Sequence, residues 1–305
     1  MTSILSDEAK IISFINMKGG VGKTTLTKDL GYFLATQRNY KILFIDLDPQ
    51  SNLTQSFFRK FGYHQGNLLD IVEPEDEEDE NVLAGSTKTK CKKTIGSDIS
   101  IQKLFKPGVI SHLKRADCLL ELNENISIIP GTLKAIFSER NSNIENHLFN
   151  YINQTNLKEE FDFIFIDCPP TYSNYTISAL ITSDYYVTPS KPDAYSVLGI
   201  EMLHEVVKRV KEEHQVYFTS KSLKSLGVIF TELAPYSKGY SDQINEIKTS
   251  SKIEELNIHF FEKHFVYNSY IPKRAEYFIG DSSSNTKEDL IVLADEFERR
   301  FNEIE

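Results

Sequence analysis

The 305-residue sequence contains no tryptophan and only three cysteines, Cys91, Cys118 and Cys168. These thiols show no C-x-x-C spacing, which argues against a disulfide framework and favours a reducing compartment. The chain also lacks an apolar run of about 18 residues and a signal peptide, so we expect a cytoplasmic protein without a membrane-spanning helix. Apolar residues still make up 40% of the sequence, enough for a sizeable core.

Positive charge is in the minority, with 34 Lys and Arg against 44 Asp and Glu and a formal net charge of −10. This imbalance weighs against nucleic acid as a partner. Glu73 and residues 75–80 contribute seven carboxylates, and removing these seven from 44 leaves 37 acidic residues, close to balance. A lysine-rich stretch follows the acidic run. We expect residues 73–120 to form a charged insertion, and we favour a surface loop over a partner-binding element.

A glycine-rich segment at residues 16–25 reads Asn-Met-Lys-Gly-Gly-Val-Gly-Lys-Thr-Thr. It lies between an apolar run, Ile11 to Ile15, and a segment in which apolar residues recur at helical spacing. Strand, loop and helix in this order are the context of a phosphate-binding loop. The usual pattern G-x-x-x-x-G-K-[ST] fails because Met17 stands at its first glycine. A second lysine, Lys18, precedes a Gly-Gly pair instead.

The loop backbone predicts a cradle for phosphate. Glycines let successive N–H groups turn toward one anion, and the predicted helix, beginning at about Thr24, adds its positive end. The residues expected to line this cradle are Gly19, Gly20, Val21 and Gly22.

The polar side chains of the loop have separate expected partners. We expect Lys23 to lie near the β- and γ-phosphates, the Thr24 hydroxyl to ligate Mg²⁺, and Thr25 to bond the α-phosphate. Lys18 lies at the entry of the loop, where its side chain can point out of its own subunit.

Two further apolar runs end in carboxylates. Residues 41–46 predict a strand that ends at Asp46 and leads into Asp48, and residues 163–167 predict a strand that ends at Asp167. Because ligands in open α/β sheets gather at the carboxyl ends of strands, these carboxylates are expected to converge on the phosphate loop. The sequence therefore predicts a doubly wound, mostly parallel α/β sheet flanked by helices.

Three segments together resemble the ParA/MinD family of deviant-Walker P-loop ATPases: 18–25, 46–52 and 167–170. The form Asp-Leu-Asp-Pro-Gln-Ser-Asn of the second segment is most similar to ParA (Soj-like) partition ATPases. The resemblance covers nearly the whole chain except about residues 73–120. It implies a single P-loop ATPase domain over residues 1–305.

This resemblance implies a mechanism in trans. Two subunits would bind ATP and close face to face, and Lys18 of one would reach the phosphates of the other, like an arginine finger. Asp48 would orient the attacking water. Asp46 and Asp167 would hold the Mg²⁺ shell through waters, with Thr24 as the direct ligand. Roles in a turn or at a strand end are the structural alternatives for Asp48 and Asp167.

The resemblance also implies partners. ATP hydrolysis would be slow and stimulated by a ParB-like centromere-binding protein, and the ATP-bound homodimer would bind DNA without sequence preference, on the nucleoid. The adenine base would lie between Thr231 and Pro272. Lys273 and Arg274 are the candidate DNA contacts, with three further lysines as possible neighbours: Lys221, Lys224 and Lys238. For each of these residues taken alone, an ordinary solvated charge is the favoured alternative.

Two rival functions remain open. A MinD-like membrane ATPase needs a basic amphipathic C-terminal helix, and residues 285–304 do predict an amphipathic helix. Its polar face is mostly acidic, so we expect it to dock on the sheet and not to anchor a membrane. The other rival is a switch that positions a different cargo, such as a protein assembly. Fold and motif predict nucleotide chemistry, not cargo.

Overall fold

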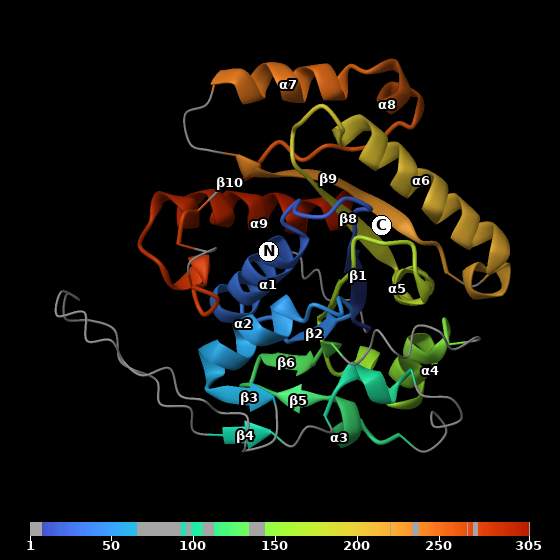
Figure 1. The fold of residues 1–305 in the computed structure, drawn as a ribbon, viewed down its shortest axis with the longest axis vertical. Coiled ribbons are helices and arrows are strands. Elements are labelled where there is room, and N and C mark those ends of the chain that lie inside the picture. Colours follow the sequence, from blue (N-terminus) through green and yellow to red (C-terminus); the bar gives the residue numbers. More distant parts are fainter. Residues whose placement is uncertain are drawn as a thin grey trace.

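The computed structural model describes residues 8–65, 93–95, 99–105, 113–133, 144–219, 221–233, 238–266, 268–270 and 274–304. One eight-stranded sheet runs through the molecule in the order β10-β9-β8-β1-β7-β2-β6-β5, with a separate pair β3-β4 (Figure 1). Every neighbouring pair is parallel except β5 with β6. The strands are β1 (Lys10–Phe14), β2 (Ile42–Asp46), β3 (Tyr63–Gln65), β4 (Lys93–Ile95), β5 (Leu120–Glu121), β6 (Ile126–Ile129), β7 (Phe163–Asp167), β8 (Tyr185–Ser190), β9 (Lys224–Leu233) and β10 (Phe265–Val266).

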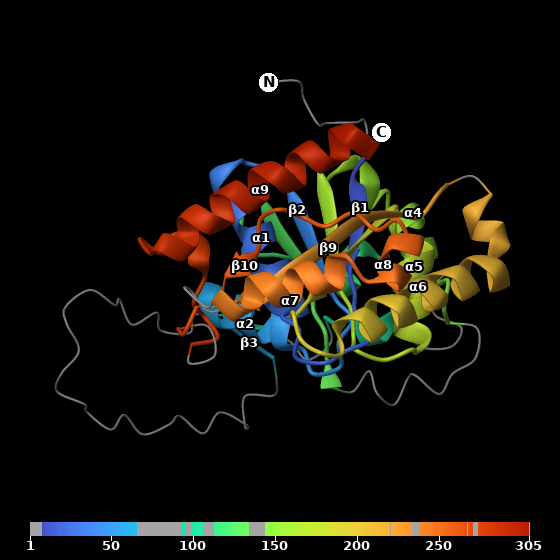
Figure 2. The same ribbon diagram turned by 90° about the horizontal axis from the view of Figure 1, so that it is seen from above.

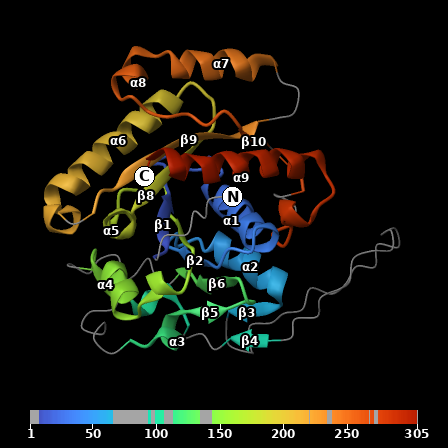
Figure 3. The ribbon, with the colours of Figure 1, turned by 180° about the vertical axis from the view of Figure 1, so that it is seen from behind.

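Helices cover both faces of the sheet, which confirms the doubly wound α/β prediction. In Figures 1 and 3, α7 and α8 lie at the β9–β10 end of the sheet, and α3 lies near the opposite end. No helix among the described residues is both long and apolar enough to cross a membrane. The α-helices are α1 (Lys23–Gln37), α2 (Asn52–Phe61), α3 (Arg115–Cys118), α4 (His147–Gln154), α5 (Asn174–Thr182), α6 (Ser196–Glu213), α7 (Lys238–Lys248), α8 (Ser251–Glu255) and α9 (Asn285–Ile304). Short 3₁₀ helices are η2 (Ile101–Lys103), η5 (Leu157–Glu159), η6 (Gln215–Phe218) and η8 (Ile279–Asp281).

The central strands are apolar at consecutive positions because both of their faces are buried. In β1, Ile12 and Phe14 pack in the cluster that includes α1, α2 and α9. Ile11 packs in the opposite cluster, which includes α4, α5 and part of α6. The predicted strands are confirmed, with β1 lying one residue earlier than the apolar run Ile11 to Ile15.

The C-terminal helix α9 docks on the sheet, as its acidic polar face predicts. Phe297 and Phe301 are fully buried, and the Phe301 ring lies 5.7 Å from that of Phe163 in β7. Figure 2 shows α9 running along the molecule beside α1. At its end, the Lys224 amine of β9 donates to the carbonyl of Ile304 (3.0 Å). The apolar face of α9 is therefore part of the core.

The expectation of a surface loop is wrong for part of residues 73–120. Leu104 and Phe105 are fully buried, and the Phe105 ring packs edge-on at 4.6 Å from Tyr175 of α5. Cys118 is buried in the same cluster. These apolar residues belong to the core because they cover the face of the sheet beside α4 and α5. The acidic run at residues 73–80 lies outside the described residues.

The candidate site lies where the chain changes direction across the sheet. β1 pairs with β7 on one side and with β8 on the other. In β7, Asp167 is in register with Phe14 of β1 and with Asp46 of β2. The loop after β1 therefore meets the ends of both carboxylate-bearing strands, at the position where this fold class binds ligands.

Candidate nucleotide-binding site

The loop between β1 and α1 has the backbone of a phosphate cradle. Gly20 and Gly22 adopt left-handed conformations, with φ of 69° and 75°, which side-chain-bearing residues rarely adopt. Gly22 caps α1, which begins at Lys23, one residue before the predicted start. The uncapped N–H groups of the first turn thus face the loop, where an anion is favoured.

The loop opens into a pocket of about 440 Å³. Its walls come from the loop, the start of α1, the segment after β2, the start of α2 and one residue each from two later segments. The lining residues are Gly19, Gly20, Val21, Gly22, Lys23, Thr24, Thr25, Lys28, Asp48, Gln50, Asn52, Gln55, Ser56, Pro170 and Ala275. The structure thus brings together the predicted loop residues and Asp48.

Lys23 supplies a buried positive charge at the base of the pocket. The residue is 6% exposed, and its amine donates to the carbonyl of Lys18 (3.1 Å). Burial lowers the pKa of Lys23, while Asp167 and Asp48 act in the opposite direction. A buried amine that lines the pocket beside the glycine-rich loop suits the β- and γ-phosphates of a nucleotide.

Asp167 is the residue that most requires a ligand. It is fully buried, and neither carboxylate oxygen has a hydrogen-bond partner among the described residues. Burial and then Asp46 raise the pKa of Asp167 well above its usual range, while Thr24 and Lys23 oppose the shift. A buried carboxylate in this condition needs a cation or ordered water. The set of Thr24 hydroxyl and Asp167 carboxylate fits Mg²⁺, which takes few protein ligands and keeps several waters.

Asp46 has a different local role from Asp167. Its Oδ2 accepts the N–H (2.9 Å) and the hydroxyl (2.6 Å) of Thr54, and its Oδ1 accepts the N–H of Asp48 (3.2 Å). Burial raises the pKa of Asp46 to about 7, although the Thr54 bonds oppose the shift. Asp46 therefore fixes the start of α2 and the turn at Asp48, and its predicted contact with the magnesium shell stays a prediction.

Asp48 combines the turn role and the pocket role that the sequence left open. Its Oδ1 accepts the N–H of Gln50 (2.9 Å), and its carbonyl accepts the N–H of Ser51 (2.8 Å). Its Oδ2 has no hydrogen bond to the described residues, and the side chain lines the pocket. The turn holds the carboxylate in place, and the predicted role of Asp48 in orienting the attacking water stays a prediction.

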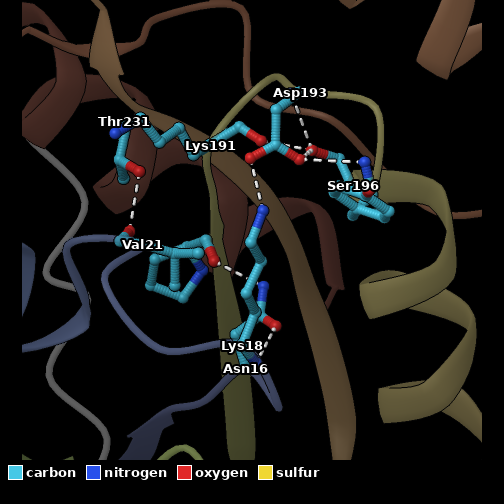
Figure 4. A network of polar contacts seen from close by, with 9 residues as sticks. Asn16, Lys18, Val21, Lys191, Asp193, Ser196 and Thr231 are labelled. Atoms are coloured by element: carbon cyan, nitrogen blue, oxygen red, sulfur yellow. Dashed lines mark hydrogen bonds and ion pairs between the residues drawn. The ribbon is translucent and has the colours of Figure 1, made fainter.

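Lys18 lies outside its own pocket and bonds to its own chain. Its amine forms an ion pair with Oδ2 of Asp193, in the loop between β8 and α6 (Figure 4). Its N–H donates to Oδ1 of Asn16 (2.9 Å), and the Asn16 amide donates to the carbonyl of Pro189 (2.8 Å). The sequence expected an outward-pointing lysine, and the acidic partner in the same chain is a finding of the structure.

Neither of the two residues predicted to contact the base, Thr231 and Pro272, is placed at the pocket by the described part of the chain. Thr231 is fully buried, and its hydroxyl donates to the carbonyl of Val21 (2.7 Å), which ties β9 to the loop (Figure 4). It does not line the pocket. Pro272 lies outside the described residues, while Ala275 nearby does line the pocket. The place of the base remains a prediction.

Two of the proposed DNA lysines are structural. The Lys221 amine donates to the carbonyls of Thr182 (2.7 Å) and Ser183 (3.0 Å) at the end of α5, and burial lowers the pKa of Lys221 to about 8. Lys224 is bonded to the end of α9. Both half-buried amines are engaged with backbone carbonyls, which gives each a structural role, and their contact with DNA stays a prediction.

Of the remaining DNA candidates, Arg274 has a side chain in the described part of the chain. Arg274 is exposed, and Lys273 lies outside the described residues. The side chain of Lys238, at the start of α7, is also outside the described part of the chain.

Sequence reasoning missed two parts of the site. The first turns of α2 line the pocket through Asn52, Gln55 and Ser56. Their position directly after Asp48 was a usable signal, because α2 begins at the same strand end. Asp193 was the second omission, and it had no signal in the sequence because it meets Lys18 only through the β1–β8 pairing.

Comparisons with known proteins agree with this geometry. The family model described as an AAA domain matches residues 9–221. An uncharacterised protein of Methanocaldococcus jannaschii is 31% identical over 78% of this chain and 79% of its own length. A ParA family protein of Mycoplasma pneumoniae is 28% identical over 84% of this chain and 82% of its own length. The sporulation initiation inhibitor protein Soj of Bacillus subtilis is 28% identical, covering 87% and 84%.

Solved structures share the fold over almost the full length of the chain. The ATP complex of a substituted McdA from Cyanothece has a TM-score of 0.68 at 20% identity, covering 96% of this chain and 95% of that one. A plasmid partition protein from Borrelia burgdorferi has a TM-score of 0.62 at 18% identity, covering 98% and 100%. With the family match and the ParA and Soj relatives, the chain belongs to the AAA domain family and is a ParA/MinD-type P-loop ATPase.

Proposed function

We propose that this chain is an ATP-dependent dimerising partition ATPase, and that hydrolysis of ATP to ADP and phosphate switches the dimer. One observation carries the proposal. Of the two loop lysines, Lys23 lines the pocket, whereas Lys18 does not line it and its side chain is partly exposed. A lysine that does not line its own pocket would have a catalytic use once a second subunit closes against it.

The residues around the pocket divide the work of hydrolysis. Mg²⁺ would neutralise charge on the β- and γ-phosphates, held by the Thr24 hydroxyl and, through waters, by Asp167. Asp48, fixed by its turn, would orient the attacking water with its free oxygen. Lys18 of the other subunit would stabilise the charge that develops on the transferred phosphoryl group. Asp46 would contribute by holding the Asp48 turn and the start of α2 in place.

The proposal includes partners outside the chain. A ParB-like centromere-binding protein would stimulate slow basal turnover. The ATP-bound dimer would bind DNA without sequence preference, which places it on the nucleoid within the cytoplasm. Support comes from the ParA relative and the plasmid partition protein. Among the described residues, the exposed Arg274 is the candidate for a contact with a DNA phosphate.

A second candidate is an ATPase that positions another cargo. Two observations favour it. Lys221 and Lys224 are engaged with backbone carbonyls, which reduces the basic surface available to DNA. McdA, whose name does not refer to DNA partition, is among the structural neighbours. Binding of the ATP-loaded dimer to DNA decides between the two candidates.

The central test compares Lys18→Ala with Asp48→Ala. Lys18→Ala is expected to bind ATP within about threefold of the unchanged chain, to lose turnover about 100-fold or more, and to stay single in light scattering. Asp48→Ala is expected to bind ATP, hydrolyse it poorly and accumulate as a dimer. Lys23→Ala is the control that loses nucleotide affinity. Normal turnover by a single-chain Lys18→Ala variant would contradict the proposal.

A further inference from the structure

The Lys18–Asp193 ion pair joins the loop to a different segment of the chain. Lys18 follows β1, whereas Asp193 follows β8, and the two strands are parallel neighbours in the sheet. Asn16 bridges the same two strand ends through its bond to the carbonyl of Pro189. The Lys18 backbone is bonded to that asparagine. The approach of the two charges is thus fixed by backbone structure on both sides.

The two oxygens of Asp193 have separate partners. Oδ1 accepts the N–H of Tyr195 (3.0 Å) and lies 3.3 Å from the Ser196 hydroxyl. The N–H of Asp193 donates to the same hydroxyl (2.9 Å), which closes the turn that starts α6 (Figure 4). Oδ2 receives the Lys18 amine. One oxygen holds the turn and the other holds the lysine.

The strength of the pair suits a contact that exchanges. Both side chains are 33% exposed, so solvent screens their attraction. The Lys18 amine also lies 5.7 Å from the exposed ring of Tyr195. A nucleoside triphosphate carries several negative charges. In a closed site it therefore attracts the Lys18 ammonium more strongly than the single, partly solvated carboxylate of Asp193 does.

We infer that Asp193 is a positioning residue that holds the Lys18 ammonium on its own chain and releases it to the phosphates of a second, ATP-loaded subunit. This inference rests on the proposed function, because it needs Lys18 to act in trans. The carboxylate keeps Lys18 at the subunit face and competes with pairing. Closure of two subunits then breaks two such ion pairs, one in each chain.

The test uses Asp193→Asn in the slow-hydrolysis Asp48→Ala background. Asparagine retains Oδ1 for the α6 turn and removes only the charge. An exposed pair shifts an equilibrium by up to about fivefold, and two are released, so the ATP-dependent dimer dissociation constant is expected to fall by up to about 25-fold. Sedimentation or light scattering over a concentration series measures it. ATP affinity of the single chain should stay unchanged.

Three control variants separate charge from structure. Asp193→Glu restores the carboxylate and is expected to return the dissociation constant toward the parent value. Ser196→Ala disturbs the turn alone and should not strengthen pairing. Adding Asp193→Asn to Lys18→Ala should leave that chain monomeric with ATP, since the ammonium that the carboxylate holds is already absent.

The outcomes distinguish this inference from the proposed function. If the Asp48→Ala parent dimerises with ATP and Asp193→Asn pairs equally or more weakly, the inference is overturned and the proposed function stands. If the parent stays single with ATP at all concentrations, both are overturned. Stronger pairing by Asp193→Asn that depends on Lys18 supports the inference.

Discussion

At the scale of single residues, the site contains charged groups that are costly without a nucleotide. Asp167 has no hydrogen bond for either oxygen among the described residues, and Asp46 needs three donors to be tolerated. Lys23 is buried beside them. Such groups are retained at functional sites because a bound ligand or ion completes their interactions. The energetic cost of Asp167 should therefore be measurable in the nucleotide-free chain.

We expect Asp167→Asn to stabilise the nucleotide-free protein at high pH. Folding raises the pKa of Asp167, so this carboxyl loses its proton at a lower pH in the unfolded chain than in the folded one. The free energy of unfolding therefore falls as the pH rises above about 4. At pH 8 the variant should have a free energy of unfolding about 1–3 kcal/mol above that of the unchanged chain, shrinking toward pH 5. Urea unfolding at both values measures the difference.

The control for this effect is Glu205→Gln, which removes an exposed carboxylate of α6. It should change stability little at either pH, because solvent already hydrates that charge. An Asp167→Asn variant that was less stable than the unchanged chain at pH 8 would show that the buried carboxylate is satisfied without a ligand.

At the scale of elements, the position of the loop depends on how closely α1 and α6 approach the sheet. Gly31 in α1 lies against Phe44 of β2 so closely that an added Cβ would be 2.5 Å from two ring atoms. Gly199 in α6 has more space, since its Cβ would meet only Oδ1 of Asn16 at 3.5 Å. A side chain at position 31 would therefore clash with the sheet, whereas a side chain at position 199 has room.

Substituting each glycine with alanine sets the cost of a steric clash against the gain in helix propensity. Gly31→Ala should lower the free energy of unfolding by up to about 2 kcal/mol, because an overpacking cost of about 1–3 kcal/mol against Phe44 outweighs the gain of about 1 kcal/mol in helix propensity. Gly199→Ala should be neutral or stabilising by up to about 1 kcal/mol. Thermal or urea unfolding of both variants checks the pair. Equal effects of the two substitutions would mean that α1 can move away from the sheet at little cost.

The sequence predicted those elements whose residues contact their neighbours in a regular pattern. β7 was predicted at its observed bounds, because a strand buried on both faces is continuously apolar. Leu104 and Phe105 were not recognised as core, since charge dominates the residues around them and their contact with Tyr175 is far away in the sequence. Local pattern does not contain such long-range packing.

The same limit applies to the site. The loop glycines and Lys23 were predicted from the order of strand, loop and helix, and Asp48 was predicted from its place after a strand end together with the family resemblance. Asp193 and the engaged amine of Lys221 depend on which strand ends become neighbours. A lysine in a sequence carries no information on whether a carbonyl in another segment accepts its hydrogen bonds.

At the scale of the whole molecule, net charge and local charge make different predictions about DNA. The chain carries a formal charge of −10, so the proposed DNA binding would require a local basic surface. In the proposed dimer, two copies of that surface would double the number of phosphate contacts on one duplex. Pairing would then provide a physical reason for DNA affinity to depend on ATP.

We expect the Asp48→Ala variant to bind random-sequence duplex DNA with ATP and not with ADP. Each phosphate that is neutralised contributes about −0.9 to the slope of log K against log salt concentration, so fluorescence anisotropy across a salt series counts the contacts. Arg274→Ala should weaken binding for all sequences and reduce the slope by about 1 for each subunit engaged. Arg209→Ala, an exposed arginine paired with Glu213 on α6, removes the same charge and should leave the slope unchanged. A dimer that forms with ATP but has no salt-dependent affinity for DNA would exclude DNA partition and leave cargo positioning as the function, because pairing and hydrolysis depend on residues that do not contact DNA.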